Sequence, residues 1–263
     1  MSDWLGIGNK TIIVTGGSSG IGSAISDELA KQGANVVIAD IQSSKDLQEK
    51  QVFIQTDVTK RDSVAHMVDE VMERFGTIDG LVNNAGINIP RLLVDNESDY
   101  YELNDATFDK MIDINQKGVF ICSQLVGKKM AEAKQGVIIN MASESGLEGS
   151  EGQSIYAATK AALYSYTRSW AKELGKYHIR VAGVAPGILE ETGLRTQEYE
   201  EALAYTRGIS VDELRASYDK VSIPMKRVGK LQEVADMVSF LLSDRASYVT
   251  GTTYNITGGK SRA

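Results

Sequence analysis

Short runs of apolar, largely β-branched residues recur along the chain, and polar or glycine-containing turns bound each of them. The runs are continuous rather than alternating, which is typical of strands buried on both faces of a parallel sheet. The pattern predicts strands at Thr11–Thr15, Asn35–Ala39, Val52–Gln55, Asp79–Asn83, Gly136–Ala142, Ile179–Ala185 and Thr252–Ile256.

Longer segments with helical periodicity separate these runs. They are Gly20–Gln32, Ser63–Phe75, Ala106–Ala133, Ser154–Tyr177 and Gln232–Ser243. Repeated alternation of strand and helix predicts right-handed crossovers, and therefore a seven-stranded parallel sheet with helices on both faces. We expect a single doubly wound α/β Rossmann domain over residues 1–263. The polar stretch of about 188–228 interrupts the alternation, and we interpret it as a helical lid over a substrate.

Composition and charge narrow the class of partner. The chain has 42% hydrophobic residues, a net charge of −7 and a pI of about 5.0. Nucleic acids and anionic membrane surfaces bind clustered basic residues, so we expect neither as a partner. No apolar stretch approaches the ~20 residues of a membrane span.

The single cysteine and the two histidines do not indicate a disulfide or a metal site. Cys122 is the single cysteine, which excludes an intrachain disulfide and fits a reducing, cytoplasmic compartment. The N-terminal stretch lacks the basic and apolar regions of a secretory signal. His66 and His178 have no carboxylate or cysteine at ligand spacing, so we expect no metal site.

A glycine-rich turn follows the first apolar run. The sequence GGSSGIG places Gly16, Gly20 and Gly22 where a strand gives way to a helix. Glycines allow a tight turn and close approach of a pyrophosphate, while the helix start directs unpaired N–H groups at the anion. Asp40 ends the next run, where a carboxylate hydrogen-bonds the adenosine ribose and repels a 2′-phosphate. These features predict a dinucleotide site that prefers NAD to NADP.

A tyrosine and a lysine lie four residues apart near the start of the segment Ser154–Tyr177. Tyr156 and Lys160 therefore project from the same face of the predicted helix. Taken alone, such a pair is typical of a solvated surface, so the rest of the chain has to decide whether it is functional.

Three motifs in order give the chain a resemblance to the short-chain dehydrogenase/reductase family. They are TGGSSGIG from Thr15 to Gly22, NNAG from Asn83 to Gly86, and Tyr-x-x-x-Lys. The resemblance extends from Thr11 to about Gly259. It implies an oxidoreductase that interconverts an alcohol and a ketone with a nicotinamide cofactor. The catalytic residues that it implies are Asn115, Ser143, Tyr156 and Lys160.

The resemblance also implies which residues bind the cofactor. They are Gly16, Ser18, Ser19, Gly20, Ile21, Asp40, Ile41, Asp57, Val58, Asn83, Ala85, Gly86, Tyr156, Lys160, Pro186, Gly187, Ile188 and Thr192. One position departs from the family. A threonine often follows the glycine of the Pro-Gly turn by four residues, but Glu191 stands there and Thr192 comes next. We take Thr192, with the backbone of Ile188, as the candidate for the nicotinamide amide.

The tyrosine–lysine pair now has a chemical interpretation. A phenol with a pKa near ~10 is a poor general base at neutral pH, and a neighbouring ammonium is expected to lower that pKa. We interpret Tyr156 as the acid/base for the hydroxyl proton and Ser143 as a hydrogen-bonding partner of the substrate oxygen. By resemblance, Lys160 also holds the nicotinamide ribose. We expect Asn115 to bend or water-link the helix beneath and to carry a proton path towards Lys160.

The substrate is approached through resemblance and local charge. NNAGINIPRLLVD, ASESGLEGSEGQSIYA and GLRTQEYEEALAYTRG resemble family members that oxidise a sugar-alcohol phosphate with NAD. The polar, glycine-rich loop after Ser143 also suits a polyol better than an acyl chain. A guanidinium can bind phosphate bidentately. The candidate substrate residues are Ser143, Glu144, Arg91 and Arg195, with Arg207 as a further arginine.

Two alternatives remain open. The first is another member of the same family, acting on a polyol, gluconate or a 3-oxoacyl thioester; Asp40 argues against an NADPH-dependent biosynthetic reductase. The second is a dinucleotide-sensing protein without catalysis, which the intact catalytic set argues against. Assembly as a homotetramer, through pairing of the helices Ala106–Ala133 and Ser154–Tyr177 and docking of C-terminal segments, is implied by the resemblance.

Overall fold

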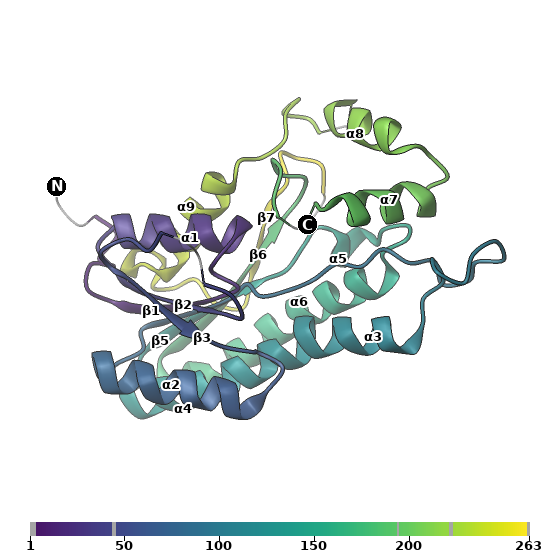
Figure 1. The fold of residues 1–263 in the computed structure, drawn as a ribbon. Coiled ribbons are helices and arrows are strands. Elements are labelled where there is room, and N and C mark those ends of the chain that lie inside the picture. Colours follow the sequence, from purple (N-terminus) through teal and green to yellow (C-terminus); the bar gives the residue numbers. More distant parts are fainter. Residues whose placement is uncertain (1–3, 44–45, 194, 221–222, 262–263) are drawn as a thin grey trace.

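The computed structural model describes residues 4–43, 46–193, 195–220 and 223–261. Its strands form one parallel sheet in the order β3-β2-β1-β4-β5-β6-β7 (Figure 1). They are β1 (Thr11–Thr15), β2 (Asn35–Asp40), β3 (Gln51–Gln55), β4 (Gly80–Asn83), β5 (Gly136–Met141), β6 (Ile179–Pro186) and β7 (Thr253–Ile256). Every predicted strand is confirmed, and its ends lie within one residue of the prediction.

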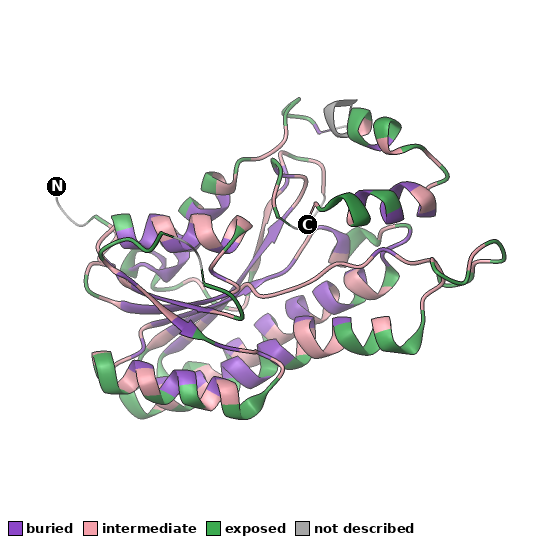
Figure 2. Ribbon diagram, viewed as in Figure 1, coloured by how far each residue is buried: buried purple, intermediate pink, exposed green. Residues whose placement is uncertain are grey.

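Helices cover both faces of this sheet. On one face lie α1 (Gly20–Lys31) and α9 (Leu231–Leu242), and on the other α2 (Arg61–Phe75), α4 (Val119–Ala133) and α6 (Ser154–Leu174). Side chains alternate along each strand, so Ile12 and Val14 of β1 pack with α1 and α9, whereas Ile13 packs with α2 and α4. Figure 2 shows the strands as a buried layer between the two helical layers. The predicted doubly wound α/β fold is confirmed.

The predicted helix Ala106–Ala133 consists of three consecutive pieces. Asn104 caps α3 (Asp105–Ile112) by accepting a hydrogen bond from the N–H of Thr107 at 2.9 Å. A π-helical segment, η1 (Asp113–Gly118), then joins α3 to α4. Wider π turns occur often at functional sites, and this one contains the predicted catalytic residue Asn115.

The predicted lid stands beyond the carboxyl edge of the sheet and contains α7 (Gln197–Thr206) and α8 (Val211–Lys220) (Figure 1). Leu203, Ala204 and Leu214 form a small apolar cluster between these two helices. Residues 194, 221 and 222 of the lid lie outside the described residues.

Short helical turns complete the fold: α5 (Ser145–Glu148), η2 (Gly175–Tyr177) and η3 (Asp244–Ala246). Within the described part of the chain, no helix combines the length and apolar character that crossing a membrane requires. Because all the strands are parallel, their carboxyl ends meet at one edge. The predicted site residues that follow these ends therefore gather there.

Candidate active site

The glycine turn between β1 and α1 is closely packed. Gly16 and Gly20 have φ angles of +62° and +53°, a region that favours glycine. A Cβ at Gly22 would lie 2.0 Å from the carbonyl oxygen of Gly16, and one at Gly16 would lie 2.8 Å from Cα of Ala85. Any side chain at these positions would displace the backbone, so the turn requires glycine at both.

The start of α1 is suited to an anion. Ser19 is the residue before the helix, and its side chain makes no capping hydrogen bond. The first N–H groups of α1 therefore have no side-chain acceptor at the positive end of the helix dipole. This arrangement fits the pyrophosphate of a dinucleotide, with Ile21 in the first helical turn.

Asp40 connects the end of β2 to the glycine turn. Its carboxylate accepts hydrogen bonds from the N–H groups of Ser18 at 3.0 Å and Ile41 at 2.7 Å. The Ser18 hydroxyl donates to the carbonyl oxygen of Gln42 at 2.6 Å. The carboxylate is thus held beside the glycine turn, and its contact with an adenosine ribose stays a prediction.

The two asparagines of NNAG have different roles. The amide of Asn83 donates to Ser123 Oγ and Asn140 Oδ1, both at 2.9 Å, so its side chain lies in a buried network beneath the sheet. The amide of Asn84 instead donates to the carbonyl oxygens of Thr15 at 3.1 Å and Gly16 at 3.0 Å. Asn84 therefore supports the glycine turn. Asn84 was not among the predicted site residues, although its place in NNAG pointed to it.

The tyrosine and lysine predicted to be catalytic lie on the first turns of α6, as their spacing predicted. The ammonium of Lys160 donates to the carbonyl oxygen of Met141 at 2.8 Å and lies 5.7 Å from the centre of the Tyr156 ring. Burial lowers the pKa of Lys160 to about 8. A buried lysine with this pKa titrates close to neutral pH.

The pKa of Tyr156 differs from the expectation. Withdrawal of the phenol from water raises its pKa, and a hydrogen bond with the Ser143 side chain opposes that rise. We expected the neighbouring ammonium to lower this pKa. In the protein without ligands, desolvation of the phenolate outweighs any such effect, and the ammonium is engaged by Met141.

Asn115 joins the π segment to the loop after β4. It is completely buried, exchanges two 2.9 Å hydrogen bonds with the backbone of Ile87, and donates to Thr159 Oγ1 at 3.1 Å. A Cβ at Gly86 would lie 3.3 Å from Asn115 Oδ1 and 3.5 Å from Lys160 Nζ. Asn115 and Lys160 therefore border the same small space beside Gly86.

The loop after β5 carries Ser143 and Glu144. Ser143 Oγ accepts a hydrogen bond from the Ser145 hydroxyl at 3.0 Å. The carboxylate of Glu144, predicted to meet the substrate, instead contacts Lys260 Nζ at 2.5 Å and Ser261 Oγ at 2.7 Å. The structure thus directs the charged end of Glu144 to the C-terminal residues.

The turn after β6 lies against the glycine turn. The N–H of Gly187 donates to Ile256 at 3.0 Å, and the carbonyl oxygen of Ile188 accepts from Gly229 at 3.0 Å. A Cβ at Gly20 would lie 3.5 Å from Cβ of Thr192. Thr192 therefore lies near the start of α1, and its contact with the nicotinamide amide stays a prediction. Pro186, which ends β6, accepts from the N–H of Glu144 at 3.1 Å.

Asp57 and Val58 form the turn after β3. The Asp57 carboxylate accepts from the N–H and hydroxyl of Thr59 at 2.9 and 2.7 Å. Val58 is buried against Gly118, where a Cβ would lie 2.8 Å from Val58 Cγ2. Both residues are at the carboxyl edge of the sheet, on the β3 side of the glycine turn.

The three candidate arginines have different surroundings. The N–H of Arg91 donates to Gly152 at 2.7 Å, and its guanidinium lies 4.7 Å from the centre of the Tyr100 ring. Arg195 Nη2 donates to the carbonyl oxygen of Leu189 at 2.9 Å. Arg207 is the residue that follows α7. Among the three, Arg91 is the one whose backbone is hydrogen-bonded beside the start of α6.

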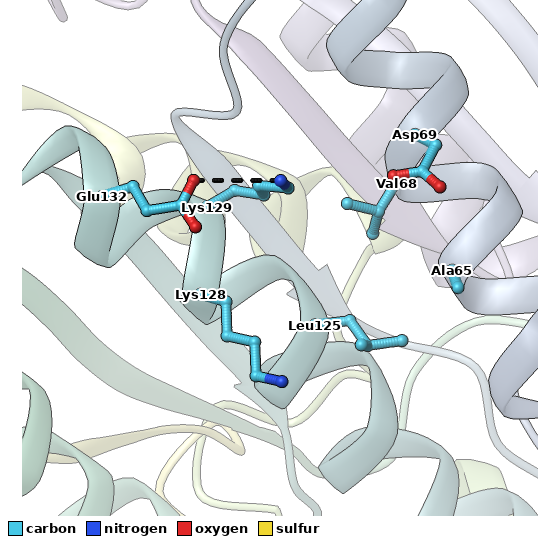
Figure 3. A pocket seen from close by; sticks show the side chains of 7 residues that line it. All are labelled: Ala65, Val68, Asp69, Leu125, Lys128, Lys129 and Glu132. Atoms are coloured by element: carbon cyan, nitrogen blue, oxygen red, sulfur yellow. Dashed lines mark ion pairs between the residues drawn. The ribbon is translucent and has the colours of Figure 1, made fainter.

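A surface hollow lies between α2 and α4, away from the predicted site residues (Figure 3). It is lined by Ala65, Val68, Asp69, Leu125, Lys128, Lys129 and Glu132. This hollow contains none of the predicted site residues. Among the described residues, no group of three or more histidine, cysteine, aspartate or glutamate side chains could hold a metal ion.

Known proteins resemble this chain over nearly its whole length. It is 59% identical over 266 residues to sorbitol-6-phosphate 2-dehydrogenase of Klebsiella pneumoniae, with 100% of both chains covered. It is 38% identical to a 3-oxoacyl-[acyl-carrier-protein] reductase of Staphylococcus epidermidis, with 95% of this chain and 98% of the other covered.

Solved structures of other dehydrogenases and reductases have the same fold as this chain. The ligand-free aldohexose dehydrogenase of Thermoplasma acidophilum superposes with a TM-score of 0.84 at 30% identity, over 98% of this chain and 96% of that one. Levodione reductase gives 0.83 at 33% identity, over 96% and 98%. A family model described as short chain dehydrogenase matches residues 10–203. The chain therefore belongs to the short-chain dehydrogenase family and is an oxidoreductase.

Proposed function

We propose that this protein is an NAD-dependent sorbitol-6-phosphate 2-dehydrogenase, which interconverts sorbitol 6-phosphate and fructose 6-phosphate. The 59% identity over the whole chain to the Klebsiella pneumoniae enzyme carries the proposal. The 3-oxoacyl reductases match at 38% or below. The polar loop around Ser143–Glu148 also suits a polyol better than an acyl chain.

Family membership implies a nicotinamide dinucleotide as cofactor. The glycine turn between β1 and α1 fits such a group. Its glycines allow the pyrophosphate to approach the backbone, and the start of α1 offers N–H donors. We propose NAD rather than NADP, since the carboxylate of Asp40 accepts hydrogen bonds from ribose hydroxyls and repels a phosphate at the same place. When bound, the nicotinamide supplies the site that accepts or returns the hydride.

Side chains of the protein are proposed to transfer the proton of the substrate hydroxyl. Tyr156 is proposed to exchange the hydroxyl proton with the substrate through its phenol oxygen, and Ser143 to hydrogen-bond the same substrate oxygen. At neutral pH the phenol is protonated, which is the form that donates a proton during ketone reduction; its raised pKa by itself makes it a weaker acid, so catalysis requires the phenolate to be stabilised when cofactor and substrate are bound. Lys160, with a pKa of about 8, is suited to hold or release that proton near neutral pH.

Asn115 maintains the geometry beneath this pair. Its side chain ties η1 to the loop of Gly86 and Ile87 and also reaches Thr159 of α6. We propose that it fixes the distance between that loop and Lys160 and borders the path of the proton. Arg91 is proposed as the main phosphate partner, because its backbone is joined to Gly152 beside the start of α6.

Location, domain organisation and assembly are further parts of the proposal. We propose one domain with a lid of about 188–228, a cytoplasmic location that fits the buried free thiol of Cys122, and a homotetramer. Phe108 of α3 and Phe120 of α4 are each 41% exposed, and helix pairing between subunits would cover them. Light scattering after size exclusion tests the tetramer.

One assay tests the activity. The purified protein is incubated with NAD or NADP and with sorbitol 6-phosphate, sorbitol or an oxoacyl thioester, and absorbance of the reduced nicotinamide is followed. We expect the highest kcat/KM with NAD and sorbitol 6-phosphate. Equal use of sorbitol and its phosphate would exclude phosphate recognition, and preference for the thioester would make the protein a 3-oxoacyl reductase.

A further inference from the structure

The C-terminal segment after β7 returns to the loop that carries Ser143. Lys260 Nζ lies 2.5 Å from Glu144 Oε1 and 3.8 Å from Glu148 Oε2. The hydroxyl of Ser261 donates to Glu144 Oε2 at 2.7 Å. Two consecutive C-terminal residues thus hold both carboxylate oxygens of the residue next to Ser143.

Glu144 lies between the Ser143 loop and the turn after β6. Its N–H donates to the carbonyl oxygen of Pro186 at 3.1 Å, and a Cβ at Gly187 would lie 2.9 Å from its Oε2. Movement of Glu144 would therefore displace two backbone segments of the site at once.

The opposite side of the same loop is held by α6. The Tyr164 hydroxyl donates to the carbonyl oxygen of Ser143 at 3.0 Å. Gly146 packs directly on the α6 backbone, since a Cβ there would lie 2.8 Å from the N atom of Ala161. The loop is thus fixed between α6 and the C-terminal residues, and only the C-terminal side depends on a charged pair.

In that charged pair the carboxylate is well removed from water, whereas the ammonium side is partly exposed. Glu144 is 8% exposed, and the side chain of Lys260 is 25% exposed. Without the ammonium of Lys260, the carboxylate would keep the uncharged Ser261 hydroxyl as a donor, and a buried carboxylate that has lost its cation is strongly unfavourable where it stands. A movement of this side chain towards solvent would act on the adjoining backbone, which is that of Ser143.

We propose that Lys260 is a positioning residue, assisted by Ser261. By neutralising and holding Glu144, it keeps the Ser143 hydroxyl within hydrogen-bonding distance of the Tyr156 phenol. This inference rests on the proposed catalytic role of Ser143. It assigns to the C-terminal residues an effect on the chemical step without any contact with the reacting atoms.

The central test is Lys260→Met with its rescue variants. We expect kcat to fall on the order of 10–100-fold, because small displacements of reacting groups have effects of this size. The KM for NAD should stay within about twofold, since the glycine turn is untouched. Lys260→Arg should retain most of the activity. The double variant Glu144→Gln with Lys260→Met should recover several-fold over Lys260→Met, because it removes the unpaired charge.

Lys10→Met is the matched control. Lys10 pairs with Asp244 at 2.6 Å, and its side chain is 27% exposed, close to the 25% of Lys260. It precedes β1 and so lies at the opposite edge of the sheet from the site. We expect it to retain wild-type kcat.

Several results would overturn the inference. Unchanged kcat in Lys260→Met would do so, and a raised substrate KM at normal kcat would make Lys260 a substrate contact instead. Wild-type activity, measured first on every substrate above, judges the proposed function separately. A double-mutant cycle of Glu144→Gln and Lys260→Met in urea unfolding needs no substrate, and absence of coupling there would also refute the idea.

Discussion

Replacing Lys160 by methionine should produce a protein that is inactive but more stable at neutral pH. Lys160 is 6% exposed, and its ammonium has the carbonyl oxygen of Met141 as an uncharged partner. Burial of the charge lowers its pKa from 10.5 to about 8. Methionine has a similar helix propensity and no charge to desolvate, so the substitution removes the penalty while preserving much of the packing.

The magnitude follows from the pKa. A change from 10.5 to about 8 corresponds to about 3 kcal/mol of preference for the neutral amine in the folded protein. Loss of the hydrogen bond to Met141 offsets about 1 kcal/mol of this gain. We therefore expect Lys160→Met to raise the free energy of unfolding by about 2 kcal/mol at pH 7.

The sign of the pH dependence is specific to a lysine whose folded pKa is depressed. Below pH 8 the amine is charged in both states, and the wild type carries the full penalty. Between about 8 and 10.5 the folded protein has released the proton and the unfolded chain still binds it, so wild-type stability rises with pH relative to the variant. About 2 kcal/mol of the difference should disappear between pH 7 and pH 9.5.

Urea unfolding followed by circular dichroism, at one protein concentration and at both pH values, measures this difference. Lys172→Met is the control on the same helix, since Lys172 is exposed; its effect should stay within about 0.5 kcal/mol and not change with pH. A Lys160→Met protein less stable than the wild type at pH 7, or a difference independent of pH, would refute the reasoning.

Three further predictions concern activity. Tyr156→Phe should lower kcat at least ~100-fold, because it removes the group that exchanges the proton, while the Kd for NAD by calorimetry stays nearly unchanged; near-normal turnover would contradict the assignment. Asp40→Ser should raise the ratio of kcat/KM with NADP to kcat/KM with NAD by on the order of tenfold, or about 1.4 kcal/mol. The same substitution should lower the melting temperature, because the N–H groups of Ser18 and Ile41 lose their acceptor. Arg91→Ala should raise KM for sorbitol 6-phosphate and leave KM for NAD unchanged. An effect seen equally with unphosphorylated sorbitol would argue against a phosphate contact.

Local sequence determined the elements of the fold and their order. A strand buried on both faces needs apolar residues at consecutive positions, so β1 and β2 could be located from their sequences alone. The glycine turn was equally local, because the clash that a side chain at Gly22 would cause is with Gly16, six positions away in the chain. The i, i+4 spacing also placed Tyr156 and Lys160 on one face of α6.

Contacts between distant segments were decided only by the tertiary structure. The pairing of Glu144 with Lys260 joins residues 116 positions apart, and no periodicity encodes it. Asn83 and Asn84 are identical neighbours, yet one side chain enters the buried network and the other supports the turn. The depressed pKa of Lys160 arises from the depth at which the packed helices and sheet bury its amine. Spacing sets which face of an element a side chain occupies, whereas burial and partners depend on what the rest of the chain packs against that face.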